Sequence, residues 1–147
     1  MENDVQLAQS RLCSFGHKEE GLAYILRPAA YGVIQDSQGR FACVEEASGL
    51  FLPGGGSQEM EAPEATVVRE VREECAFEVL RLERIGFAEQ FFISDDGVAY
   101  QLQATFFRAA FGLATGGSPE LELCFLDPKQ ARLRLFHECH RWALDGV

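Results

Sequence analysis

The chain has 147 residues, 47% of them hydrophobic and 24% charged, which is the length and composition of a single globular domain. Its 13 basic and 23 acidic side chains give a formal net charge of −10 at pH 7. This charge argues against binding a nucleic-acid polymer or an anionic membrane through a basic face. It does not exclude a phosphate compound that arrives with divalent cations.

The cysteines and the N-terminus indicate a reducing compartment. The chain has five cysteines, an odd number, and no C-x-x-C pair, so we expect free thiols rather than a disulfide framework. The first residues contain no apolar segment behind a basic one, and no apolar run of membrane-spanning length occurs anywhere in the chain. We therefore expect a soluble, cytoplasmic protein.

The apolar runs predict one mixed α/β domain that covers residues 1–147, with residues 1–20 loosely ordered. The expected strands, in chain order, are residues 22–26, 29–34, 41–45, 50–52, 78–93, 98–111 and 121–126. The expected helices are residues 63–75, 128–133 and 136–144. Residues 29–34 and 41–45 flank turn residues and are expected to form a hairpin, and residues 22–26 are expected to form a short edge strand before Pro28.

Acidic side chains concentrate on the first expected helix. Seven glutamates and two arginines lie between Glu59 and Glu78, so half of the net charge falls in this segment. At 100° per residue, Glu70, Glu73 and Glu74 share a sector of roughly 100°, beside the apolar face that includes Val67 and Val71. Carboxylates this close repel one another, and a hard divalent cation such as Mg²⁺ would offset that repulsion.

A glycine-rich loop precedes this helix. Gly54, Gly55 and Gly56 follow a short apolar run and Pro53. Glycines let a backbone approach a ligand closely, with amides available to phosphate oxygens and a carbonyl available to a metal. Arg69 lies one turn before Glu73, where its guanidinium can orient a carboxylate. Carboxylate-bound metal ions beside such a loop indicate a substrate with adjacent phosphates, most simply a diphosphate.

This pattern resembles the Nudix hydrolase family, whose motif runs G, five residues, E, seven residues, then R-E-apolar-x-E-E-x-G-apolar. The matching residues are Gly55, Glu61, Arg69, Glu70, Val71, Glu73, Glu74 and Phe77. An acidic helix is usually only a solvated face, but a chance match to the whole pattern is on the order of one in a hundred thousand. The resemblance covers roughly residues 24–145, and the C-terminal segment is similar to that of small bacterial, MutT-like members.

The resemblance implies an α/β/α sandwich with a mixed sheet, and Mg²⁺- or Mn²⁺-dependent hydrolysis of a nucleoside diphosphate linked to a moiety X. It implies that Glu70 and Glu74 are the principal metal ligands, with Glu73 nearby and the Gly55 carbonyl completing the set. Arg69 would hold the cluster by a salt bridge, and Glu70 is an alternative general base. A later carboxylate often contributes, for which we favour Glu122 over Glu120 and Asp95.

Three positions depart from the family pattern: Ala76 and Met60 replace glycines, and Gln58 stands where glutamate is frequent. If Ala76 has a left-handed conformation, alanine costs about 1 kcal/mol relative to glycine there. None of the departures removes a carboxylate of the cluster. Because the carboxylates are retained, we favour an enzyme over the alternative, a non-catalytic Nudix-fold module that senses a nucleotide or metabolite.

Other features have simpler explanations. His137 and His140 are spaced for a helix but lack further zinc ligands, so we expect a helix that packs Trp142 and Leu144 inward. Most of the aromatic residues are expected in the core, although Tyr31, Phe51, Phe91 and Tyr100 are candidates to stack on a nucleobase. The sequence leaves open the identity of X and whether the chain forms a homodimer.

Overall fold

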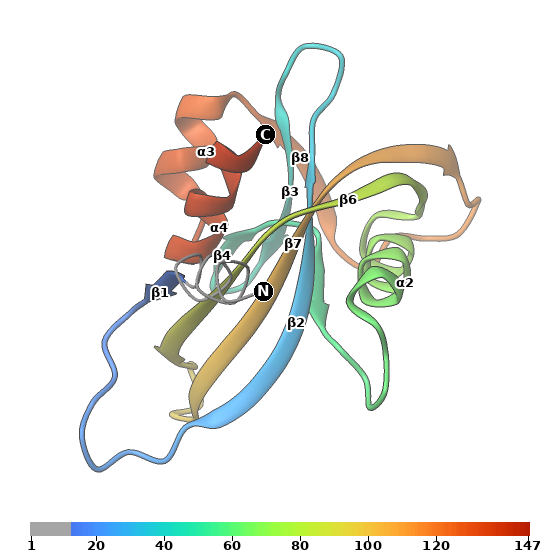
Figure 1. Cartoon of the computed structure of the whole chain (residues 1–147). Coiled ribbons are helices and arrows are strands. Elements are labelled where there is room, and N and C mark those ends of the chain that lie inside the picture. Colours follow the sequence, from blue (N-terminus) through green and yellow to red (C-terminus); the bar gives the residue numbers. More distant parts are fainter. Residues whose placement is uncertain (1–12) are drawn as a thin grey trace, which may run out of the picture.

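A computed structural model describes residues 13–147 and shows two sheets with helices on both sides (Figure 1). A five-stranded sheet has the order β1-β6-β7-β2-β5, and a three-stranded sheet has the order β4-β3-β8. The strands are β1 Cys13–Phe15, β2 Ile25–Ile34, β3 Phe41–Glu46, β4 Gly49–Phe51, β5 Gly54–Gly56, β6 Phe77–Ile93, β7 Ala99–Ala114 and β8 Glu122–Leu126. The helices are α2 Pro63–Cys75, α3 Pro128–Arg134 and α4 Glu138–Ala143, followed by a 3-10 turn at Leu144–Gly146.

The large sheet is mixed, as the family resemblance implies. Strand β2 runs parallel to β7 and antiparallel to β5, while β1 runs parallel to β6. Strands β6 and β7 form a long antiparallel pair that extends to the end of α2. The expected segment of loose order, residues 1–20, lies partly outside the described residues. Its described part includes β1, which adds an edge strand to β6.

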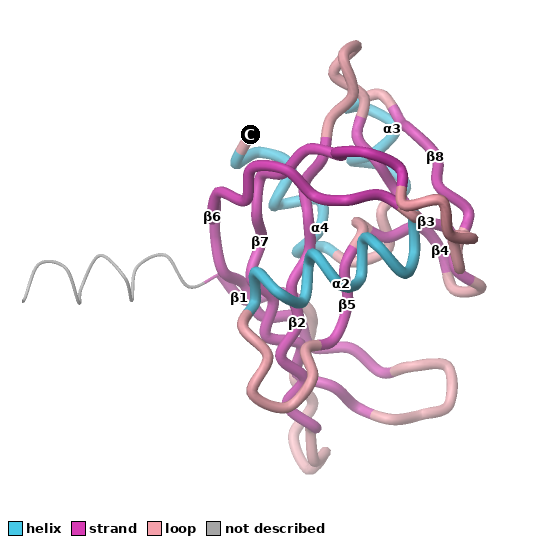
Figure 2. Tube along the Cα trace, turned by 90° about the vertical axis from the view of Figure 1, so that its right-hand side faces the viewer, coloured by secondary structure: helices cyan, strands magenta, loops and turns pink. Residues whose placement is uncertain are grey.

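Helix α2 has the bounds that the sequence predicts. Pro63 occupies its first turn, and Val67 and Val71 are fully buried against the sheet. In Figure 2, seen from the α2 side, the helix crosses the sheet at β2 and β5. The helix ends at Cys75, and the next residue, Ala76, has a left-handed conformation with a φ of 59° and a ψ of 39°. The strain considered for alanine at this position therefore applies.

The core has one apolar cluster on each side of the sheets. On the α2 side, Val67 and Val71 pack with Ile34, Phe107 and Val44. On the other side, the core is formed by side chains of β2, β3, β7, α3, α4 and the 3-10 turn, among them Val33, Phe41, Phe106, Ala131 and Leu144. The fold is therefore the α/β/α sandwich expected from the sequence.

The hairpin expected from residues 29–34 and 41–45 does not form as a two-stranded ladder. The turn itself is present, since the Asp36 carboxylate accepts bonds of 2.9 Å from the amides of Gln38 and Arg40. Beyond a single bridge between Gln35 and Phe41, however, β2 and β3 belong to different sheets. The edge of β2 that a hairpin partner would need is taken by β5 and by the carbonyl of Pro53.

The other differences are at element ends. Of the strand expected at residues 22–26, only Ile25 and Leu26 are in a strand, where they begin β2. Strand β7 continues to Ala114, beyond the expected end at residue 111. The expected C-terminal helix is shorter, because the Phe136 amide bonds to the carbonyl of Leu50 in β4. All five cysteines are free. Among residues 13–147, no helix is long and apolar enough to cross a membrane.

Candidate active site

The acidic ridge of α2 lies at the edge of the face that packs on the sheet. Glu74 is turned inward and only 6% exposed, Glu70 is half-buried, and Glu73 is exposed. These depths follow from the helical spacing, because Glu74 adjoins buried Val71 and Cys75 while Glu73 lies farther round the helix. Solvent exposure therefore increases from Glu74 through Glu70 to Glu73.

The glycine-rich loop, β5, lies directly against these carboxylates. The Gly54 amide donates a hydrogen bond of 2.9 Å to Oε1 of Glu74. Gly54 has a φ of 145°, and a Cβ there would lie 2.2 Å from the carbonyl oxygen of Ala30, so only glycine fits. A Cβ at Gly55 would lie 3.0 Å from the carboxyl carbon of Glu70. Glycines thus allow the loop to approach both carboxylates.

Arg69 connects the helix to the loop. Its guanidinium donates to both carboxylate oxygens of Glu61 at 2.8 and 2.9 Å, and to the carbonyl of Gly56 at 3.0 Å. It also donates to Glu70 at 2.8 Å and to Glu73 at 3.3 Å. Bidentate pairs of this kind fix geometry as well as charge. The structure therefore brings Arg69 to the position in which the sequence predicts that it holds the cluster.

Burial and mutual repulsion change the proton affinity of the cluster. Burial, with added repulsion from Glu70, Glu46 and Glu120, raises the pKa of Glu74 to about 8, although the Gly54 amide opposes this shift. Burial also raises the pKa of Glu70 above its usual value, against the effect of Arg69. By contrast, hydrogen bonds from Arg69 lower the pKa of Glu61 to about 2. Without a bound cation, Glu61 is therefore ionised and Glu74 is largely protonated near neutral pH.

These oxygen donors fit a hard divalent cation. Glu70 and Glu74 offer carboxylate oxygens beside a glycine backbone, and a cation between them would offset the repulsion that raises both pKa values. Among residues 13–147, no three acidic, histidine or cysteine side chains converge as a complete metal site. The cluster is therefore a candidate donor set, not a preformed cage.

Two backbone groups of the loop already have partners within the cluster. The Gly54 amide is bonded to Glu74, and the Gly56 carbonyl is bonded to Arg69. In this conformation the Gly54 amide orients Glu74 and is not free for a phosphate, while the Gly56 carbonyl, an acceptor, holds the Arg69 guanidinium. The assignment of Gly54, Gly55 and Gly56 to substrate binding, and of the Gly55 carbonyl to metal binding, stays a prediction.

The position of the late carboxylate also stays a prediction, but the structure distinguishes its candidates. The amide of Glu120 bonds to the carbonyl of Glu73 at 3.0 Å, and the charge of Glu120 contributes to the raised pKa of Glu70 and Glu74. Glu122 pairs with Glu45 across the three-stranded sheet. Asp95 lies in the loop between β6 and β7, at the cavity described next.

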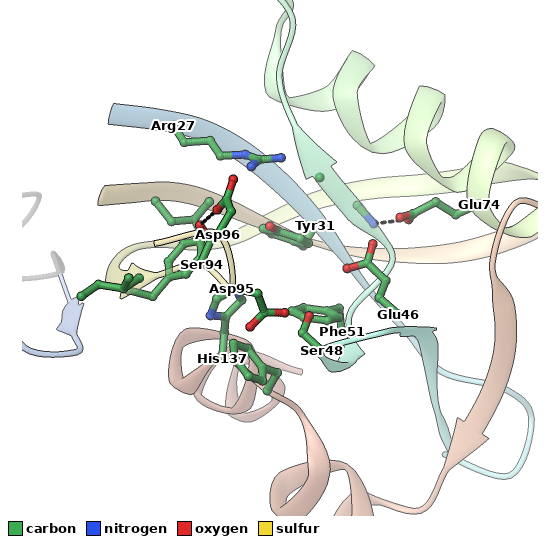
Figure 3. A pocket seen from close by; sticks show the side chains of 16 residues that line it. Arg27, Tyr31, Glu46, Ser48, Phe51, Glu74, Ser94, Asp95, Asp96 and His137 are labelled. Carbon is green, nitrogen blue, oxygen red and sulfur yellow. Dashed lines mark hydrogen bonds between the residues drawn. The ribbon is translucent and has the colours of Figure 1, made fainter. Parts of the chain in front are cut away.

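A cavity of about 420 Å³ opens beside Glu74, Gly54 and Gly55 (Figure 3). Its acidic lining residues are Glu46, Glu74, Asp95 and Asp96, and its one arginine is Arg27. Its aromatic lining residues are Tyr31, Phe51, Phe92, Phe136 and His137. The volume is in the range of small-molecule sites, and the aromatic rings offer faces or edges to a planar group.

The cavity contains residues that the sequence analysis did not select. Tyr31 and Phe51 were aromatic candidates, and both line the cavity, whereas Phe91 and Tyr100 do not. Glu46 and Arg27 had no sequence signal, because each is a single charged residue on or near a strand end. Only the meeting of β2, the β3–β4 turn and the β6–β7 loop places them together.

His137 and His140 form part of an aromatic cluster. His140 is fully buried, its Nδ1 accepts a hydrogen bond of 3.2 Å from the Leu52 amide, and its ring centroid lies 4.2 Å from that of Tyr31. Burial lowers the pKa of His137 to about 4, so its imidazole is neutral at pH 7. Leu144 is buried as expected, and Trp142 is partly buried against the same core. A packing role for this segment is therefore supported.

The fold and the site together define a class of enzyme. A helix that carries clustered carboxylates, a glycine loop that holds them and an adjoining cavity are the parts that hydrolysis of a phosphoanhydride requires. The model of the NUDIX domain family matches residues 25–143. The chain belongs to the Nudix family and is a Nudix pyrophosphohydrolase.

Solved structures agree with this family. A NUDIX hydrolase from Nitrosomonas europaea superimposes with a TM-score of 0.68 at 13% identity, covering 83% of this chain and 88% of that chain. A MutT NUDIX hydrolase from Burkholderia pseudomallei gives 0.61 at 22%, covering 84% and 98%. A mutator MutT protein from Bacillus halodurans gives 0.64 at 18%, covering 81% and 80%. No curated protein matches the chain by sequence.

Proposed function

We propose that the protein hydrolyses the pyrophosphate bond of a nucleoside diphosphate linked to a moiety X, such as a nucleoside triphosphate or a nucleotide sugar, with Mg²⁺ or Mn²⁺. The observation that carries this proposal is the direct contact between Gly54 and Glu74 at the edge of an aromatic-lined cavity. A diphosphate at the carboxylates would leave a nucleobase within reach of the aromatic lining. The proposed substrate is a small molecule, because the net charge of −10 disfavours binding of a nucleic-acid polymer.

In the proposed site, Glu70, Glu74 and Glu73 hold the cation, with Gly55 and Glu122 as further ligands. When bound, the cation supplies charge neutralisation to the diphosphate and lowers the pKa of a water molecule. Arg69 keeps Glu70 and Glu73 in register with the loop through its bonds to Glu61 and Gly56.

Glu70 is the alternative general base, for the case in which Glu74 and Glu73 hold the cation without it. Its pKa is raised above the usual glutamate value, and a base with a pKa closer to neutrality accepts a proton more effectively. Attack by a water oxygen forms one P–O bond and breaks the bond from that phosphorus to the bridging oxygen. The proton removed from the water goes to Glu70, and the bridging oxygen leaves with the second phosphate.

The test is a product screen with purified protein and a matched variant. Nucleoside triphosphates, nucleotide sugars, dinucleoside polyphosphates and dinucleotides are offered with Mg²⁺ or Mn²⁺ to the native protein and to Glu74→Gln. We expect one class to be cleaved, with the variant slower by several orders of magnitude and still folded by circular dichroism. Equal rates in the two proteins would refute the role of Glu74. Binding of the panel without turnover would instead support the sensor alternative.

A further inference from the structure

Arg27 occupies a distinctive position in the cavity. It lies on β2 and is the one lysine or arginine among the described residues that line the cavity, whose lining also contains four acidic residues. His137, the other basic residue of the lining, is neutral at pH 7 because burial lowers its pKa to about 4. The fixed positive charge of this cavity is therefore that of Arg27.

The guanidinium of Arg27 contacts an aromatic ring but no carboxylate within salt-bridge distance among the described residues. The guanidinium carbon lies 5.6 Å from the centroid of the Tyr100 ring, a cation–π distance. Arg27 forms no salt bridge with any side chain of residues 13–147, whereas Arg40, Arg69 and Arg72 each do. A guanidinium that is placed but has no carboxylate partner keeps its donors available for an incoming anion.

Gly56 makes the room that this side chain uses. A Cβ at Gly56 would lie 3.2 Å from Nε and 3.4 Å from one terminal nitrogen of Arg27. The φ of Gly56 is not in the left-handed region, so its backbone does not require glycine. The third glycine of the loop therefore serves the close approach of Arg27 to the segment that also holds the carboxylate cluster.

We propose that Arg27 is a substrate-binding residue that donates hydrogen bonds to a phosphate oxygen of the substrate. This inference rests on the proposed function, because Arg27 would bind the same diphosphate that the carboxylates bind through a cation. The carboxylates can reach phosphate oxygens only through a cation, whereas the fork of an arginine binds them directly. In the view of Figure 3, Tyr31 lies between Arg27 and Glu74, and all three residues line the same cavity.

The nearby carboxylates make a positive charge necessary for phosphate binding in this cavity. Asp95, Asp96 and Glu46 would repel a diphosphate that entered the cavity without a positive partner. Arg27 supplies that positive partner. Loss of the Arg27 charge therefore weakens binding of the phosphates and leaves the aromatic contacts intact.

The experiment measures binding separately from turnover. Titration calorimetry with Mg²⁺ compares the native protein with Arg27→Met and Arg27→Lys, using the α,β-methylene diphosphates of adenosine, guanosine, cytidine and uridine, which resist hydrolysis at that bridge. We expect Arg27→Met to weaken the best of these probes by about 10- to 100-fold, the usual effect of losing hydrogen bonds to a charged group. Arg27→Lys restores part of the affinity, because it returns the charge without the fork.

Two further variants separate a specific contact from general effects. Arg84→Met removes the same charge from a residue over the Phe107 ring, outside the cavity, and should leave affinity within about twofold. Gly56→Ala should weaken the probe in the native background, because its methyl displaces Arg27, and should add little to Arg27→Met. This non-additivity is the signature of a shared contact.

Each outcome has a distinct meaning. Equal affinity of the native protein and Arg27→Met overturns the Arg27 assignment, whether or not the protein hydrolyses a substrate. A loss as large in Arg84→Met also overturns it, because net charge alone would then explain the effect. Failure of every methylene probe to bind the native protein overturns it as well. Arg27-dependent binding without turnover of any panel member supports the assignment and removes the hydrolase proposal alone.

Discussion

The amide of Gly54 donates a hydrogen bond of 2.9 Å to Oε1 of Glu74, which joins the glycine loop to the most buried carboxylate of α2. Both residues are nearly enclosed, and the loop could not approach so closely with a side chain at residue 54. This contact gives the carboxylate a fixed orientation toward the cavity. Because Glu74 is buried, its raised pKa should appear as a pH dependence of the protein's stability.

Glu74 makes the metal-free protein less stable as the pH rises. Its pKa is raised from 4.5 to about 8 in the folded protein, so between these values the folded state binds a proton that the unfolded state has lost. The free energy of unfolding therefore falls with rising pH across this window, by a few kcal/mol as an order of magnitude. Urea unfolding in a chelator from pH 5 to 9 measures the slope.

Glu74→Gln is the matched variant for this slope. It should flatten the curve and raise stability at pH 8, since a neutral amide avoids the cost of burying a charge. His137 and His140 have lowered pKa values and contribute the opposite slope below pH 6.5, but their contribution cancels in the difference between the two proteins. A difference that does not change with pH would contradict the buried, proton-binding state of Glu74.

The late carboxylate can be located by two neighbouring variants. Glu120→Gln removes a charge that acts on both Glu70 and Glu74, whereas Glu122 pairs with Glu45 on the three-stranded sheet. We expect Glu120→Gln to change the concentration of Mg²⁺ needed for half-maximal turnover more than Glu122→Gln does. A larger effect of Glu122→Gln would favour the ligand position inferred from the sequence.

Arg69 should contribute more to the stability of the protein than Arg72, although both residues lie on α2. Arg69→Met removes bonds to Glu61, Glu70 and Glu73 in a half-buried network, which should cost about 1–3 kcal/mol of stability. Arg72 pairs with exposed Glu78, so Arg72→Met should cost clearly less stability than Arg69→Met. Thermal unfolding measures both. Equal losses would show that the Arg69 network adds nothing beyond a surface pair.

Ala76→Gly should stabilise the protein by about 0.5–1 kcal/mol. Ala76 has a φ of 59° at the end of α2, where glycine avoids the strain of a left-handed conformation. Ala65→Gly, at an exposed position inside the same helix, is the control and should lose about 1 kcal/mol. Urea unfolding should move the two midpoints in opposite directions, and a shift of both to lower urea would exclude relief of strain.

Met60→Gly tests relief of left-handed backbone strain in the segment between β5 and α2. Met60 has a φ of 63° and a side chain that is 98% exposed, so glycine removes strain without removing packing. We expect a stabilisation similar to that of Ala76→Gly, measured in the same assay. A destabilisation would mean that the side chain restricts the unfolded chain more than it strains the folded loop.

The sequence by itself determined the family motif, the bounds of α2 and the nature of its carboxylates, because these depend on local spacing. Val67, Val71 and Cys75 fix which face of the helix is buried, and that face sets the place of Glu70 and Glu74 on the ridge. The left-handed residue at Ala76 could be anticipated for the same reason, since helix ends follow local rules.

Only the tertiary structure decided how residues distant in sequence meet. It separates β2 from β3, because the edge of β2 pairs with the glycine loop, and a local turn signal at Asp36 carries no information on that competition. It also brings Arg27, Glu46 and Asp95 into one cavity from separate segments. The depth of Glu74, and hence its raised pKa, depends likewise on what covers the helix, which residue spacing alone does not specify.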